Sequence, residues 1–243
     1  MDMKILLVCL VSSLLAGFVH GSLGMGFGMI AMATVPLFMP YNNAAAIVSV
    51  ALLVLVVQVC ILLREDIDWQ NVLIPAAVLA TGKILGIVLM MHLQSSALHF
   101  ALGGFLILYS VSQLLNLKAL QIRGTLPEAV LTCGLGGLFG GVFNVSGPLA
   151  SIYCQAKYGD SPRAYAANMN AIFAPAGVIA VVMHLCYGNF SPECIVGSII
   201  MVAGVIFATI LGVAVLKRLD AAKMRFLSYI YIIIMGTVIC VSG

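Results

Sequence analysis

The sequence predicts an all-α protein that crosses a membrane several times and consists of two inverted repeats. Hydrophobic residues form 63% of its 243 residues and charged residues 8%, whereas charged residues make up roughly a quarter of a soluble globular domain. Apolar stretches of about 20 residues, enough to span a bilayer as a helix, recur along the chain. Similar glycine-rich segments interrupt both halves, so we expect about eight to ten hydrophobic segments.

The first hydrophobic element is broken. Its two apolar stretches, 5–20 and 25–40, flank the glycine-rich segment from His20 to Gly28. Non-helical backbone inside a membrane is tolerated only where it is buried in protein or lines a wet cavity. We therefore expect a broken or re-entrant helix pair here, whose second, short helix begins near Gly26 to Met29.

Full-length transmembrane helices are expected to follow at the apolar stretches 43–63, 71–91 and 97–116. The second half then begins with another broken element, 127–158, in which the stretches 127–142 and 147–158 flank Gly136 to Pro148. Its short second helix is expected to begin near Gly147 to Leu149. Three more full-length helices are expected at 164–186, 193–215 and 224–242.

The two halves, residues 1–120 and 121–243, are predicted to be repeats of one plan. An offset of 120 residues aligns the two broken elements, and an offset of 126 aligns residues 86–93 with residues 212–219. Two matches in the same order indicate a duplicated chain.

Lysine and arginine residues predict the orientation, because cytoplasmic loops retain them. If each broken element enters and leaves on the same face, Lys4 lies opposite nine other basic residues: Arg64, Lys118, Arg123, Lys157, Arg163, Lys217, Arg218, Lys223 and Arg225. Continuous crossings would divide these ten residues four against six, which favours neither orientation. The first arrangement gives each half an odd number of full crossings, which makes the repeats inverted. We therefore expect a protein of the cytoplasmic membrane with basic loops in the cytoplasm and both termini outside.

The glycine breaks are the first candidates for a binding site. Each short second helix would present unpaired N–H groups and the positive end of its dipole near the membrane midplane, and this field favours an anion. The candidate substrate-binding residues of the breaks are Gly24, Gly26, Gly28, Asn144, Ser146 and Gly147. In the alternative interpretation, the glycines only permit close helix packing, as in Gly17-x-x-x-Gly21 and Gly82-x-x-x-Gly86.

Lys83 is predicted to supply the countercharge for an anionic substrate. It is the only ionisable residue deep within a full-length span, where an unpaired charge costs about 3 kcal/mol. In the alternative, it reaches the membrane surface or bonds a backbone carbonyl. No Asp or Glu lies near the middle of a span, which disfavours a cation as the substrate.

Histidine and asparagine supply the remaining candidates. His20 directly precedes the first break, and Asn168 and Asn170 follow Arg163 at the start of a span. We include His20 and Asn168 among the substrate-binding candidates, although an intramembrane Asn more often bonds another helix. Arg163 is interpreted as an anchor that sets the topology.

Several classes of function are disfavoured. The net charge is only +3 and no long basic run is present, which is unlike a nucleic-acid-binding surface. The sequence lacks a Gly-x-x-x-x-Gly-Lys-Ser/Thr loop, an H-E-x-x-H pattern and a Gly-x-Ser-x-Gly elbow, so we expect no enzyme and no catalytic residues. The seven cysteines include no C-x-x-C pair, and we expect neither a metal site nor another cofactor.

At its two glycine-rich segments the chain resembles the sulfite exporter TauE/SafE family of membrane permeases. The matching residues are Gly17, Gly21, Gly24, Gly26, Gly28, Pro36 and Leu37, and in the second half Gly137, Gly141, Ser146, Gly147, Pro148, Arg163 and Ala164. The resemblance covers nearly the whole chain in length, duplicated layout and motif position. It implies secondary transport, often export, of small sulfur-containing anions such as sulfite or organosulfonates. The sequence departs from the family pattern at Asn144, where another glycine is common, and at Phe27, which interrupts a glycine triplet.

We therefore expect a secondary-active carrier of such anions in the lipid bilayer, with the two breaks meeting at a central site. A coupling ion, either proton or sodium, and a homo-oligomeric state both stay open. One alternative is a non-transporting membrane subunit that anchors or assembles a larger complex. Another is a divalent-metal permease that uses His20 and the thirteen methionines, although methionine in so apolar a chain more often packs.

Overall fold

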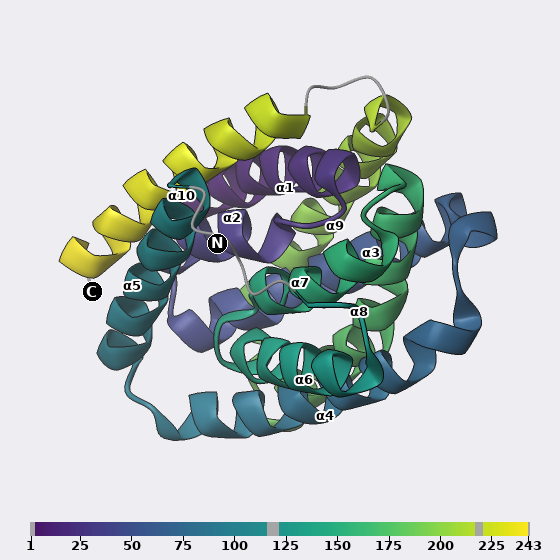
Figure 1. Cartoon of the computed structure of the whole chain (residues 1–243). Coiled ribbons are helices and arrows are strands. Elements are labelled where there is room, and N and C mark those ends of the chain that lie inside the picture. Colours follow the sequence, from purple (N-terminus) through teal and green to yellow (C-terminus); the bar gives the residue numbers. More distant parts are fainter. Residues whose placement is uncertain (1–2, 116–121, 217–220, 243) are drawn as a thin grey trace.

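The computed structural model describes residues 3–115, 122–216 and 221–242, and within these ranges it is built from α-helices and two short 3₁₀ turns (Figure 1). Seven helices in the described ranges are long and apolar enough to cross a membrane. The predicted all-α polytopic membrane fold is therefore confirmed. Three basic residues used to predict the orientation, Lys118, Lys217 and Arg218, lie outside the described residues.

Both halves have the same order of elements. The first contains α1 (Met3–Leu23), α2 (Phe27–Thr34), η1 (Val35–Leu37), α3 (Tyr41–Leu62), η2 (Arg64–Asp66), α4 (Trp69–His92) and α5 (Ser95–Leu114). The second contains α6 (Leu126–Phe143), α7 (Gly147–Tyr158), α8 (Pro162–Cys186), α9 (Pro192–Val215) and α10 (Ala221–Ser242). A helix thus occurs at each of the six expected full-length spans.

Both breaks are shorter than the glycine-rich segments that predict them. α1 continues to Leu23, so that only Gly24–Gly26 interrupts the first element, and α6 continues to Phe143, so that only Asn144–Ser146 interrupts the second. Both α1 and α6 are among the helices long enough to cross a membrane. Most of the glycines around the breaks are therefore helical residues.

Each broken element folds back on itself as a hairpin. A Cβ atom on Gly136 of α6 would lie 3.2 Å from the backbone nitrogen of Ala150 on α7. In the first element, the backbone N–H of Phe27 on α2 donates to the Nδ1 atom of His20 on α1, with 3.3 Å between the two nitrogens. Neither element is one continuous helix.

Three helix starts follow ordinary capping rules. Thr125 and Glu128 form a capping box at α6, in which each side chain bonds the other residue's backbone,. Ser161 accepts from the backbone N–H of Ala164 at 3.3 Å and Ser191 accepts from that of Cys194 at 3.3 Å. Both serines precede a proline, which suits the first turn of a helix.

The two halves interlock. α1 packs most extensively against α9, and α6 packs most extensively against α4. If each helix of α1–α5 is exchanged for its counterpart in α6–α10, the α1–α9 interface becomes the α6–α4 interface. In the same way, the α3–α9 contact becomes the α8–α4 contact. The contacts of α3 with α8 and of α5 with α10 map onto themselves. Two repeats of one plan would produce this pattern, although the division at residue 120 stays a prediction.

Glycines bring the paired backbones into direct contact. A Cβ atom on Gly141 of α6 would lie 2.5 Å from the Cα atom of Gly86 on α4. A Cβ atom on Gly21 of α1 would lie 3.1 Å from the Cα atom of Gly212 on α9. Small residues allow such close packing in membranes, where dispersion contacts hold helices together. For these glycines the packing interpretation is therefore the one that the structure supports.

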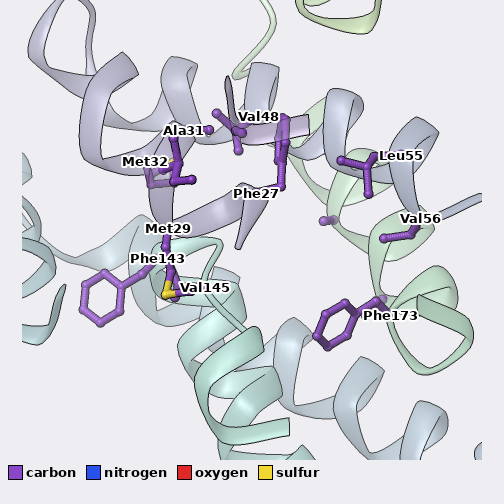
Figure 2. Packing of buried hydrophobic residues seen from close by; sticks show 14 of the residues in the cluster. Phe27, Met29, Ala31, Met32, Val48, Leu55, Val56, Phe143, Val145 and Phe173 are labelled. Carbon is purple, nitrogen blue, oxygen red and sulfur yellow. The ribbon is translucent and has the colours of Figure 1, made fainter. Parts of the chain in front are cut away.

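The short helix α2 lies at the centre of the apolar core. Its residues Phe27 to Ala33 are all buried, and Figure 2 shows Phe27 and Met29 among side chains of α3, the second break and α8. Large apolar side chains such as Leu85 and Phe207 are exposed on the outside of the molecule, at 60% and 62% of their surface. This outer surface suits a hydrocarbon environment, and the core surrounds the two breaks.

Candidate functional site

The two breaks touch each other. The Cα atom of Gly28, in the first turn of α2, packs so closely on the carbonyl oxygen of Asn144 that a Cβ atom there would overlap it. Gly24, Gly26 and Asn144 have φ angles of 77°, 118° and 57°. Glycine adopts these left-handed conformations without steric cost, and Asn tolerates them better than most residues. The residue types at the breaks thus permit the sharp turns that bring the two short helices together.

A small cavity, which we call the central cavity, lies where the breaks meet. Its volume is about 30 Å³, which is room for about two water molecules. Its wall includes apolar side chains such as those of Leu52, Val56 and Phe173. The predicted site residues that line it are His20, Gly26, Gly28, Lys83, Asn144, Ser146 and Gly147.

Lys83 is buried at this cavity, with 3% of its surface exposed. Its ammonium Nζ donates to the Oδ1 atom of Asn144 at 2.8 Å. No carboxylate among the described residues forms a salt bridge with it. An ammonium group has three donors, and Asn144 accepts from one of them. Lys83 therefore brings an amine with hydrogen-bonding capacity beyond its bond to Asn144 to the central cavity, and it neither reaches the surface nor bonds a backbone carbonyl.

Asn144 is held in place by α3. Its Nδ2 atom donates to the carbonyl oxygen of Ala45 at 2.8 Å and to the Oγ atom of Ser49 at 2.9 Å. The Asn144 side chain therefore bridges α3 and Lys83. Ser49 was not predicted from the sequence, and the only signal for it is a lone hydroxyl within an otherwise apolar stretch.

His20 fixes the start of α2. Its Nδ1 accepts from the backbone N–H of Phe27, so Nε2 carries the ring proton of the neutral imidazole and donates to the Oδ1 atom of Asn170 at 3.0 Å,. The Nδ2 atom of Asn170 donates to the carbonyl oxygen of Ala166 at 2.8 Å. This chain of hydrogen bonds links α1, α2 and α8. The N–H groups of Gly28 and Met29 lie in the first turn of α2 and, as at any helix start, have no partner inside their helix.

Two predicted site residues lie outside the lining of the central cavity. Gly24 packs on Ala166, whose Cα would lie 3.0 Å from a Cβ atom at Gly24. The Nδ2 atom of Asn168 donates to the carbonyl oxygens of Ala164 and Asp66 at 2.7 and 3.1 Å, and its Oδ1 atom accepts from the backbone N–H of Asp68 at 2.7 Å. Asn168 therefore ties α8 to the segment before α4. Arg163 lies in the same region, where it forms a 2.9 Å salt bridge with Asp66.

A second, larger cavity adjoins the central one, and we call it the vestibule. It has a volume of about 450 Å³ and shares Gly26 and Met29 with the central cavity. Polar groups line it near the ends of α5 and α7 and near the start of α10; they belong to Ser112, Gln113, Gln155 and Arg225. The sequence interpretation included Arg225 only as a basic residue that sets topology.

Comparison with known proteins adds an independent observation. The family model described as "Sulfite exporter TauE/SafE" matches residues 9–239. A protein of Cupriavidus necator (strain H16) described as "Probable sulfite/organosulfonate exporter TauE" is 27% identical over 198 residues, which cover 78% of this chain and 75% of that protein. No solved structure gives a significant match to the chain.

Proposed function

The chain belongs to the sulfite exporter TauE/SafE family, and we propose that it exports small sulfur-containing anions, such as sulfite or organosulfonates, across the cytoplasmic membrane. The printed description of its relative supports this class of substrate. The observation that carries the proposal is Lys83, a buried cation beside a cavity between two helix starts. Desolvating a charge is costly in a membrane, so an intramembrane cation without a carboxylate partner favours an anionic ligand.

The groups around the central cavity suit an anion with several oxygen atoms. Lys83 Nζ has donors beyond the one that bonds Asn144, and the first turn of α2 offers the N–H groups of Gly28 and Met29,. The positive ends of the α2 and α7 dipoles point to the same place. We propose that substrate oxygens take these donors and that Asn144 holds Lys83 between transport events.

The size of the central cavity indicates that transport involves movement. At about 30 Å³ it has room for about two water molecules, whereas sulfite has four heavy atoms. Binding therefore requires the walls, which include the starts of α2 and α7, to separate. We propose secondary transport, driven by an ion gradient or by the substrate's own gradient, because the sequence has no ATP-binding loop. Proton and sodium are the candidate coupling ions.

The proposed placement in the membrane follows the inverted-repeat plan. Residues 1–120 and 121–243 would form the two repeats, with the basic loops in the cytoplasm and both termini outside. Epitope tags at each terminus test this placement, since antibodies should reach them from outside intact spheroplasts. Labelling that occurs only after permeabilisation would instead indicate the opposite orientation, with both termini in the cytoplasm.

Counterflow in proteoliposomes tests the function directly. We would measure exchange of labelled sulfite, sulfate, thiosulfate, propane-1-sulfonate and acetate by the unaltered protein, by Lys83→Met and by Lys157→Met. Lys157 is an exposed lysine on α7 that lines neither cavity, so Lys157→Met controls for the loss of one charge. We expect selective flux of sulfur-containing anions that Lys83→Met abolishes and Lys157→Met retains. Absence of flux for every anion with folded, unaltered protein would refute the anion-carrier proposal and leave the divalent-metal permease and the non-transporting subunit as the explanations.

A divalent-metal permease has less support. Among the residues that the structure describes, no group of three or more His, Cys, Asp or Glu side chains gathers to hold a metal ion. His20 uses both ring nitrogens in hydrogen bonds with Phe27 and Asn170. A metal at His20 would have to displace one of these partners.

A further inference from the structure

The lining of the vestibule is amphipathic. Its inner part, next to the first break, consists of apolar residues such as Val19, Leu23 and Ile30, and Phe105 and Ile152 extend this apolar wall. Its other part carries the guanidinium of Arg225 and the side-chain amides of Gln113 and Gln155. A ligand that fills the vestibule would therefore need a polar head and an apolar body.

The charge of the lining selects the sign of that head. Among the residues that the structure describes, Arg225 is the only charged one that lines the vestibule, and none of the described lining residues is acidic. Its side chain is exposed, so a ligand reaches it without first breaking a buried ion pair. A planar guanidinium can donate two parallel hydrogen bonds to one oxyanion. One cationic group matches a head with one negative charge.

The vestibule also leads to the proposed transport site. The two cavities share Gly26 and Met29. Met25, another vestibule residue, accepts a hydrogen bond on its sulfur from the Tyr165 hydroxyl at 3.3 Å and lies close to Gly147 at the start of α7, with 3.7 Å from its Cβ atom to the position of a Cβ at residue 147. Gly26 of the first break and Met29 of α2 therefore line both the vestibule and the cavity at which Lys83 lies.

We propose that the vestibule is a second substrate site, which binds a small organic monoanion with its charged head at Arg225 and its alkyl body against Phe105, Leu149 and Ile152. This inference rests on the proposed function. The vestibule has about 450 Å³ and the central cavity about 30 Å³, so in this conformation only the vestibule has room for the organic body. Inorganic sulfite, which has no apolar part, gains nothing from this wall. The vestibule would thus determine the preference for organosulfonates over sulfite.

A series of alkanesulfonates tests this site by binding. We would measure stabilisation of the purified protein against thermal unfolding in a neutral detergent by methane-, ethane-, propane- and butane-1-sulfonate. Each methylene buried against the apolar wall should raise the affinity by roughly fourfold. Affinity that does not change along the series would overturn the proposal.

Two variants and a matched control locate the site. Arg225→Gln should lower the affinity for butane-1-sulfonate by about tenfold, and Ile152→Thr should reduce the gain per methylene. Arg123→Gln is the control, because Arg123 is an exposed arginine that does not line the vestibule. Equal effects of Arg225→Gln and Arg123→Gln would assign the change to the general surface potential and overturn the proposal.

The remaining outcomes separate a free anion from a lipid and the vestibule from the transport function. An anionic phospholipid has the same chemistry of head and tail. If native mass spectrometry detects such a lipid on the unaltered protein and Arg225→Gln releases it, the vestibule is a lipid site and the proposal is wrong. Sulfite counterflow that is intact alongside binding independent of chain length contradicts the vestibule proposal alone. Absence of sulfite counterflow by the unaltered protein contradicts the proposed function.

Discussion

The contact between α4 and α6 predicts that one methyl group at Gly141 disturbs both stability and the central cavity. In Gly141→Ala the new Cβ would lie 2.5 Å from the Cα of Gly86 and 2.6 Å from the backbone nitrogen of Ile87. Nonbonded carbon atoms pack best at about 3.5–4.0 Å, so the two helices must separate by about 1 Å. Overpacking costs about 1–3 kcal/mol, and we expect about 3 kcal/mol because backbone atoms cannot rotate away.

The same separation acts on Lys83. This residue lies on α4, and its partner Asn144 follows the end of α6, with 2.8 Å between Nζ and Oδ1. An added distance of about 1 Å takes the pair beyond the range of a hydrogen bond. Lys83 would then no longer be held in position to donate to the substrate, and we expect Gly141→Ala to weaken sulfite binding by about tenfold, the low end for loss of one hydrogen bond between a charged group and the substrate.

Two neighbouring glycines on α5 provide the controls. Gly104 has open space around it, whereas a Cβ atom on Gly103 would lie 2.7 Å from the carbonyl oxygen of Gly236 on α10. Thermal unfolding in detergent, with and without sulfite, should show Gly104→Ala at least as stable as the unaltered protein, because Ala is the better helix former. Gly103→Ala should be destabilised yet keep the stabilisation by sulfite. If Gly141→Ala behaves like Gly104→Ala, the close α4–α6 contact is refuted; if it behaves like Gly103→Ala, its link to Lys83 is refuted.

Three further substitutions have distinct expected results. Asn144→Asp places a carboxylate against Lys83 in a backbone conformation that Asp tolerates,, and the resulting ion pair competes with the substrate. Stabilisation by sulfite should therefore require at least about tenfold more sulfite, and an unchanged requirement would count against Lys83 as the countercharge. Asn168→Ala removes three hydrogen bonds of a buried amide and should lower the unfolding free energy by about 2 kcal/mol, while the affinity for sulfite stays within about twofold of that of the unaltered protein. A larger loss of affinity would indicate that Asn168 belongs to the substrate site. Arg163→Gln breaks a partly exposed salt bridge with Asp66 and should change the unfolding free energy by less than about 1 kcal/mol, which chemical denaturation in detergent can check.

The positions of both breaks were predictable because they depend on local chemistry. Glycine and asparagine allow the positive φ angles at Gly24, Gly26 and Asn144,, and the short helices begin directly after the breaks, at Phe27 and Gly147. The extent of the breaks was not predictable in the same way. By composition alone, Gly21 and Gly141 cannot be distinguished from the glycines of the breaks. Both are nevertheless helical, and each packs against the backbone of another helix.

The partners of the site residues depend on contacts between distant parts of the chain. Asn168 and Asn170 are two positions apart on one helix, about 200° around its axis, and the sequence does not say which of them faces the first break. Asn170 does, and it bonds His20 from 150 positions away. Ser49 and the vestibule were missed for the same reason, since they arise only when helices from both halves come together.

The interlocked packing of the two halves has a consequence for how the protein is made. α1 emerges from the ribosome well before its principal partner α9, which begins at Pro192. During synthesis Gly17 and Gly21 of α1, together with the polar His20, are therefore exposed to lipid or to an insertion factor until α9 has been translated. A truncated chain that ends before α9 would leave that surface open, and a quality-control protease that recognises unpartnered polar helices would remove it.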